Sequence, residues 1–180
     1  KTLNDEWPHH LRVDAMDMEI FSKHPIVSHR LYPIGEYRGF VECEILVGDH
    51  LLTVVLNHTY PPVTFGRQGY EWRNEQLVKL ASTFADHPHP FLVIGDFNAS
   101  PWSPFFRALI ETTGWQGASI EFIPIGTHAL IAPQSRCFAQ PIDHALCNHA
   151  ARIYHKQIGP YLGSDHRPLI VDLAIGVGEE

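Results

Sequence analysis

The stretch Phe91-Leu92-Val93-Ile94-Gly95-Asp96-Phe97-Asn98 places four consecutive apolar residues directly before a glycine and two polar side chains. A short apolar run bounded by turn residues is consistent with a fully buried strand. Asp96 and Asn98 would then lie where that strand ends, and catalytic residues are often found on loops at the ends of rigid strands. We therefore predict a central strand at residues 91–94 and treat Asp96 and Asn98 as candidate site residues. The alternative is that both are turn residues, because Asp and Asn favour turns.

Three other predicted strands also carry polar residues at one end. These residues are Asn57 and His58 after residues 51–56, Asp143 at the start of residues 141–147, and Asp165 and His166 before residues 168–175. Carboxylate oxygens are ligands that Mg²⁺ or Mn²⁺ prefers, and His is the commonest group for proton transfer. The four clusters together therefore predict a site for hard divalent metal chemistry.

The rest of the chain mixes strands with two helices. Apolar residues alternate with glutamates over residues 40–47, which predicts a half-buried strand in a hairpin with residues 51–56. Apolar spacing predicts one helix with a buried face within residues 70–86. Further strands are expected at residues 18–21, 26–31, 152–158 and 168–175, and a second helix from Ser100-Pro101 to residue 112 or 113, ended by Gly114. Because hairpins mix with helices, we expect a layered α/β or α+β domain.

Length and composition fit one domain of 180 residues with 44% hydrophobic and 18% charged residues. No stretch approaches the roughly 18 apolar residues of a membrane span, so we expect a soluble domain. Lys and Arg total 13 against 20 Asp and Glu, which disfavours nucleic-acid binding through a broad basic face. A bound divalent metal could still attract a phosphate substrate locally. The roles of Cys43, Cys137 and Cys147 stay open, because an odd count without a C-x-x-C pair does not settle the redox compartment.

The four clusters together resemble the endonuclease/exonuclease/phosphatase superfamily, which includes exonuclease III, pancreatic deoxyribonuclease, sphingomyelinases and inositol polyphosphate phosphatases. The matching motifs are Asn57-His58 followed by Pro61, the run 95–98, Ile142-Asp143-His144, and Ser164-Asp165-His166-Arg167-Pro168, which occur in the order of the family. The resemblance implies an α/β layered sandwich of two mostly antiparallel sheets flanked by helices. It covers residues 16–175, with an irregular segment at residues 1–15 and a tail at residues 176–180.

The resemblance implies metal-dependent phosphoester hydrolysis, most simply of a phosphodiester. His166 would be the general base that activates the attacking water. Asp143 would accept the other N–H of the His166 ring, which fixes its tautomer and stabilises the imidazolium. Asp165 and Asp96 would help to hold Mg²⁺ or Mn²⁺, and Asp96 would also lie beside the nucleophile.

Three further residues would contact the substrate. The resemblance implies that Asn98 orients the phosphate or the water, and that His58 donates to a phosphate oxygen or assists the leaving group. Trp102 follows the loop after residue 98 and would line the substrate mouth. The substrate is expected to be a nucleic acid, a nucleotide or a phospholipid. A phospholipid or inositol-phosphate hydrolase and a non-catalytic module that retains the fold are the alternatives.

The chain departs from the family pattern at its start. The family has an Asn and a metal-binding Glu on its first two strands, and Glu6 is the only Glu before Met18. We expect the N-terminal part of the fold, with both residues, to lie outside residues 1–180. Weak Mg²⁺ binding, low activity and a sheet edge prone to self-association would follow. Residues 98–106 also resemble a bacterial subgroup whose members often carry transmembrane helices before this domain, which implies a membrane tether outside this chain.

Overall fold

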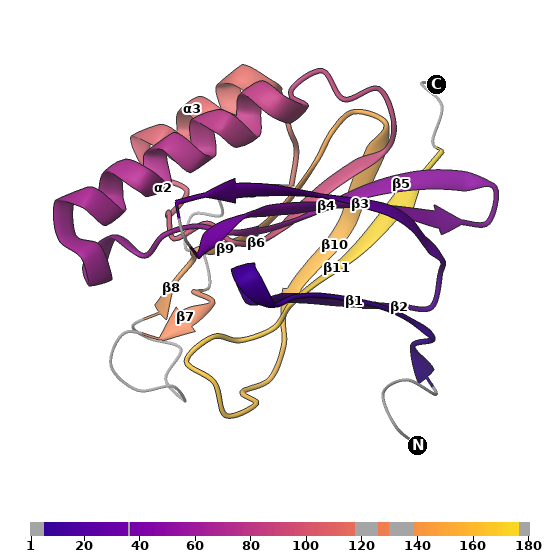
Figure 1. Cartoon of the computed structure of the whole chain (residues 1–180), viewed down its shortest axis with the longest axis horizontal. Coiled ribbons are helices and arrows are strands. Elements are labelled where there is room, and N and C mark those ends of the chain that lie inside the picture. Colours follow the sequence, from indigo (N-terminus) through magenta and orange to yellow (C-terminus); the bar gives the residue numbers. More distant parts are fainter. Residues whose placement is uncertain (1–5, 36, 118–125, 130–138, 177–180) are drawn as a thin grey trace.

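The computed structural model describes residues 6–35, 37–117, 126–129 and 139–176. At its centre is a five-stranded sheet with the strand order β3-β4-β5-β6-β9 (Figure 1). Its strands are β3 (Ile26–Ile34), β4 (Arg38–Val47), β5 (His50–His58), β6 (Phe91–Asp96) and β9 (Asp143–Cys147). Neighbouring strands are antiparallel except for β5 and β6, which run parallel. A parallel pair needs a crossover connection, and a helix provides it here.

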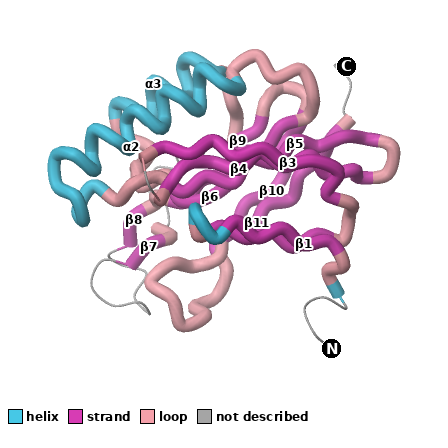
Figure 2. The backbone as a smooth tube through the Cα atoms, viewed as in Figure 1, coloured by secondary structure: helices cyan, strands magenta, loops and turns pink. Residues whose placement is uncertain are grey.

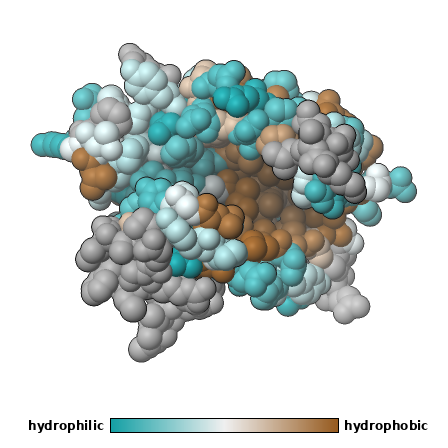
Figure 3. Space-filling model, turned by 90° about the horizontal axis from the view of Figure 1, so that it is seen from below, coloured by the Kyte–Doolittle hydropathy of each residue, from teal (hydrophilic) through white to brown (hydrophobic). Residues whose placement is uncertain are grey.

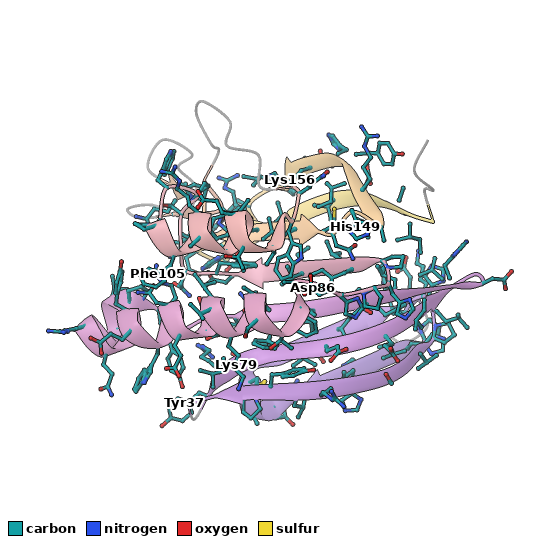
Figure 4. All side chains as sticks on the ribbon, turned by 90° about the horizontal axis from the view of Figure 1, so that it is seen from above. Tyr37, Lys79, Asp86, Phe105, His149 and Lys156 are labelled. Carbon is teal, nitrogen blue, oxygen red and sulfur yellow. The ribbon has the colours of Figure 1, made fainter. Side chains whose placement is uncertain are left out.

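Two helices form a layer on one face of this sheet (Figure 2). They are α2 (Pro62–Phe84), which connects β5 to β6, and α3 (Pro104–Thr113). Leu77, Leu80, Ala81 and Phe84 are buried, which confirms the predicted apolar face of α2. They pack on the aromatic core formed with Phe40, Phe91, Phe97, Phe106 and Trp115. Figure 4 looks down on this layer, with Lys79 on α2 and Phe105 on α3.

Two β-hairpins form a second strand layer on the opposite face (Figure 1). One pairs β1 (His9–Val13) with β2 (Met18–Ser22) across a short 3-10 helix, η1 (Asp14–Met16), and the other pairs β10 (Ala151–Ile158) with β11 (Leu169–Ile175). A short pair, β7 (His128–Ala129) and β8 (Ala139–Gln140), lies apart from them. A second buried core, with Val13, Met18, Val41, Cys43 and Val54, joins the central sheet to this layer. These layers confirm the predicted α/β sandwich.

The strand layer leaves apolar surface open on its side of the molecule (Figure 3). Leu56, Ile94 and Leu173 are partly buried residues that pack against the second core.

Within the described residues, no helix combines the length and apolar character needed to cross a membrane.

The prediction of an irregular segment over residues 1–15 is wrong for its second half. Residues 9–13 form β1, whose register with β2 pairs His9 with Ser22 and Val13 with Met18. The strand was missed because its exposed positions are histidine and arginine, while Leu11 and Val13 alternate toward the core. The domain limit at residue 16 therefore cuts a hairpin that the structure keeps whole.

The predicted starts of both helices are also wrong. α2 begins eight residues earlier than expected, and its first turns are interrupted at Gly66, whose φ of 56° and ψ of −135° are not helical. α3 begins at Pro104 and not at Pro101. The sequence repeats a serine–proline signal at Ser103-Pro104, and the earlier copy forms a turn in which Ser103 N donates to Ser100 O. The predicted end of α3 at Gly114 is confirmed, with φ of 65°.

Candidate active site

One row of the central sheet brings three site residues together. In the parallel β5–β6 pair, His58 lies opposite Asp96, and in the antiparallel β6–β9 pair, Asp96 lies opposite Asp143. The end of β5, the end of β6 and the start of β9 therefore meet at one edge of the sheet. Residues far apart in the chain become neighbours because of the strand order alone.

Gly95 allows this close approach. Its φ is 143°, and a Cβ atom added there would lie 2.0 Å from the backbone oxygen of Asn57. Asn57 is buried, and its Nδ2 donates to the Asp96 backbone oxygen at 3.3 Å. The glycine of the 95–98 run thus serves the packing of β5 against β6, beside the candidate site.

A cavity of about 490 Å³ opens at this edge of the sheet. Four of the predicted residues line it: His58, Asp96, Asp143 and His166. Apolar side chains also line it, and they come from β2, β5 and β6, namely Met18, Leu56 and Ile94. The cavity therefore combines carboxylate and imidazole groups with an apolar wall, as ligand pockets commonly do.

His166 and Asp143 form a hydrogen-bonded pair on the cavity wall. His166 Nδ1 lies 2.8 Å from Asp143 Oδ2. This hydrogen bond is the main cause that raises the pKa of His166 above its ordinary value, against the opposing effect of burial. An imidazole whose Nδ1–H is held by a carboxylate presents Nε2 to the cavity as a proton acceptor.

Thr127 holds both partners of this pair in place. Its backbone oxygen accepts from Arg167 N at 2.9 Å, and its Oγ1 accepts from Asp143 N at 3.2 Å. The segment that carries His166 is therefore tied to the start of β9 by one buried residue. The sequence offered no periodic signal for this contact, because it joins a loop residue to two distant segments.

Asp96 carries its charge in a partly desolvated position. Its two carboxylate oxygens accept hydrogen bonds from Asn98 N at 2.7 Å and Asn98 Nδ2 at 2.9 Å. Burial, with a smaller contribution from the neighbouring Asp143 carboxylate, raises the pKa of Asp96 to about 6. Asn98 adopts a left-handed backbone, with φ of 44°, and its Nδ2 also donates to Thr59 O at 3.1 Å.

The other predicted residues lie away from the cavity wall. Asn98 does not line the cavity itself, and it donates two of its hydrogen bonds described above to Asp96, which does. Trp102 is 55% exposed in the turn before α3 and does not line the cavity. The Asp165 carboxylate is 66% exposed and lies 3.8 Å from His128 Nε2, measured from its Oδ2. Their roles with substrate and metal stay predictions.

Helix α2 supplies two supporting side chains that sequence reasoning missed. Gln76 is buried, and its Nε2 donates to Gly39 O at 2.9 Å and His58 O at 3.2 Å. Arg73 Nη1 donates to Asn98 O at 2.9 Å. Their signal was available, because both fall on the helix face of Leu77 and Leu80, where a polar residue needs a reason to be buried.

The residues of the cavity fit a divalent cation. Asp96 and Asp143 bring two carboxylates to one cavity, and Mg²⁺ commonly uses one or two carboxylates together with water and substrate phosphate. The Asp96 carboxylate is buried beside the Asp143 carboxylate, which is why its pKa is raised. A bound cation would stabilise its charged form. Glu19 also lines the cavity, but its Oε1 lies 2.6 Å from His10 Nε2.

The burial of His58 can be tested through the pH dependence of the folding stability. Burial, with help from the charge of Arg38, lowers its pKa to about 4. Between pH 6.5 and 4, His58 is protonated in the unfolded chain but stays neutral in the folded protein. The free energy of unfolding therefore falls as the pH drops toward 4. We expect His58→Gln to reduce this loss by up to about 1.4 kcal/mol per pH unit. Urea unfolding at pH 6.5, 5.5 and 4.5 measures the loss of stability in each protein.

His29→Gln, at an exposed position, is the control for His58→Gln. Equal losses of stability in wild type and His58→Gln would contradict the expectation.

The layered α/β sandwich described above is the fold of the endonuclease/exonuclease/phosphatase class. The chain belongs to the Endonuclease/Exonuclease/phosphatase family, whose sequence model matches residues 7–166. No curated protein matches the chain.

Solved structures share the fold at low sequence identity. An endonuclease/exonuclease/phosphatase from Beutenbergia cavernae is 19% identical with a TM-score of 0.68, over 88% of this chain and 47% of its own. Sphingomyelinase C from Streptomyces griseocarneus is 13% identical with a TM-score of 0.64, over 94% and 75%. A beta toxin double mutant from Staphylococcus aureus, with bound magnesium ions, is 15% identical with a TM-score of 0.64, over 92% and 78%. The chain thus spans only part of each of these proteins.

Proposed function

We propose that this cavity hydrolyses a phosphodiester, with His166 as the general base and Mg²⁺ or Mn²⁺ as the cofactor. The observation that carries the proposal is the 2.8 Å contact between His166 Nδ1 and Asp143 Oδ2 on the wall of the cavity that also holds Asp96. A base, its orienting carboxylate and a second carboxylate converge on one space.

His166 takes the proton of the attacking water at Nε2. Asp143 keeps the ring in the tautomer whose Nε2 lone pair is free, and it stabilises the positive charge that the ring then carries. The raised pKa of His166 makes it a stronger proton acceptor than an ordinary histidine. Proton transfer of this kind contributes about 10²–10⁴-fold in rate.

Asp96 is the proposed carboxylate ligand of the cation on the cavity wall, and Asp165 is a further proposed ligand. When bound, the cation stabilises the negative charge on the phosphoryl oxygens. Asn98 holds the Asp96 carboxylate through two hydrogen bonds, which fixes where its oxygens point. We assign Asn98 to the positioning of Asp96 in addition to the predicted contact with phosphate or water.

His58 is placed to donate a hydrogen bond to the substrate. Its lowered pKa keeps the ring neutral near pH 7, so one ring nitrogen carries a proton and the other does not. A neutral imidazole of this kind donates to a phosphate oxygen or the leaving group without a fixed positive charge.

A phospholipid substrate is the second candidate, and the apolar wall of the cavity favours it. Met18, Leu56 and Ile94 lie beside the carboxylates, and apolar surface is exposed on the same side as the strand layer (Figure 3). The formal net charge of −7 is unfavourable for long contacts with a nucleic-acid backbone. Both points favour a small or lipid-borne phosphodiester.

The test is hydrolysis by the purified protein at millimolar Mg²⁺ or Mn²⁺, compared with EDTA. The substrates are bis(p-nitrophenyl) phosphate, p-nitrophenyl phosphate, plasmid DNA, and vesicles of phosphatidylcholine with sphingomyelin. We expect metal-dependent cleavage of bis(p-nitrophenyl) phosphate that exceeds cleavage of the monoester. Preference for vesicles over DNA would select the lipid candidate. Absence of metal-dependent cleavage of every substrate would contradict the proposal and favour a non-catalytic module.

A further inference from the structure

A cluster of two histidines and one aspartate lies beside the candidate active site. In the described parts of the chain, His128, Asp165 and His166 are the one group in which three such residues each offer a ligand atom within 4.8 Å of the others. Backbone hydrogen bonds hold them together, since Ala129 N donates to Asp165 O at 2.9 Å and His128 forms a bridge with His166. The placement is therefore a property of the backbone and not of three mobile side chains.

We propose that His128, Asp165 and His166 form a second metal site, for Zn²⁺ or a similar transition-metal ion, which shares Asp165 and His166 with the proposed active site. His128 Nε2 lies 3.8 Å from Asp165 Oδ2, and the rings of His128 and His166 are 4.7 Å apart between centroids. Zinc bonds of about 2.0–2.2 Å place tetrahedral ligand atoms roughly 3.4 Å apart, so small side-chain rotations close the site. The Asp165 carboxylate is largely exposed, which leaves the ion a path from solvent.

The donor set selects the class of metal. Two imidazole nitrogens and one carboxylate suit zinc with an open fourth position, whereas Mg²⁺ prefers oxygen ligands such as the Asp96 carboxylate. His166 already has the support that zinc-binding histidines commonly have, because its Nδ1 is hydrogen-bonded to Asp143. His128 Nδ1 is buried and has no hydrogen-bond partner within the described residues, so no internal acceptor fixes its tautomer.

Occupation of this site stops hydrolysis, a consequence that rests on the proposed function. Because Nδ1 of His166 holds Asp143, Nε2 is the nitrogen that remains for a metal. The same nitrogen is the proposed acceptor of the water proton. A His166 ring bound to zinc therefore cannot act as the base, and zinc and catalysis exclude each other.

Direct binding tests the site without reference to activity. Zn²⁺ alone is titrated into the metal-free protein by calorimetry, with Co²⁺ absorption as a second readout. We expect one tight site in wild type and at least about tenfold weaker binding in His128→Ala and in His128→Phe, which keeps a ring beside His166. His155→Ala is the matched control, because His155 also lies beside an aspartate, with its Nδ1 3.5 Å from Asp172 Oδ2 on the exposed β10–β11 hairpin. Equal binding by wild type and both folded His128 variants would overturn the site.

Measurements of hydrolysis test whether Zn²⁺ at this site blocks catalysis. With Mg²⁺ in excess, Zn²⁺ should inhibit cleavage of bis(p-nitrophenyl) phosphate by wild type and His155→Ala, and His128→Ala should need at least about tenfold more Zn²⁺. Unchanged zinc sensitivity in His128→Ala overturns the inhibitory role. Inactivity of wild type with Mg²⁺ alone would count against the proposed function, while the binding titration would still decide the zinc site.

Discussion

Replacing His166 with alanine is expected to lower kcat for phosphodiester hydrolysis by about 10²–10⁴-fold, because it removes the proposed general base. The fold should persist, since the His166 side chain lies on the cavity wall and is 32% exposed. Steady-state kinetics with bis(p-nitrophenyl) phosphate measure the loss, and thermal unfolding checks the structure.

His29→Ala is the control for this variant, because His29 is exposed on β3. Its activity should match that of wild type. Wild-type turnover by a well-folded His166→Ala protein would remove His166 from the reaction and contradict the proposed mechanism.

Asp143→Asn is expected to cost nearly as much, about 10²–10⁴-fold in kcat. The asparagine amide has almost the same shape, but its NH₂ group donates to His166 Nδ1 where the carboxylate accepted. The ring proton then moves to Nε2, the nitrogen that has to accept the proton of the water. The hydrogen bond that raises the pKa of His166 is also lost, so the pKa should fall.

Asp172→Asn is the matched control for Asp143→Asn. Asp172 also faces a histidine, His155, but this pair is exposed on the β10–β11 hairpin. Kinetics give the change in rate, and NMR titration of the His166 ring gives the change in its pKa. Full activity of Asp143→Asn would contradict an orienting role for Asp143.

The sequence was informative about the site where apolar runs end in polar residues. The ends of β5 and β6 and the start of β9 could be predicted because a buried strand needs apolar residues, and a polar residue at its end stands out. The strand order could not be derived from such patterns, since no local property of His58, Asp96 or Asp143 says which strands are neighbours. The resemblance to a known family supplied the expectation that these residues form one site, and the structure supplies the strand order.

Other features could not be predicted from the sequence because they depend on tertiary contacts. Strand β1 carries a histidine and an arginine, His10 and Arg12, at its exposed positions, so only its pairing with β2 reveals it. The helical spacing of Gln76 indicates a buried position, but no spacing rule predicts its hydrogen bond to His58 O or the hydrogen bond from Asp143 N to Thr127 Oγ1. The resemblance groups Asp165 with Asp96, yet the Asp165 carboxylate does not line the cavity, and its Oδ2 lies 3.8 Å from His128 Nε2.

Comparison of Asp143→Asn, His166→Ala and the double variant tests most directly whether these residues act as one catalytic unit. Asp143 is proposed to act only through the His166 ring, so once that ring is gone its loss should cost nothing more. We predict that the double variant hydrolyses bis(p-nitrophenyl) phosphate as fast as His166→Ala alone, within about twofold. If the two losses multiply instead, Asp143 and His166 act independently and the account is contradicted.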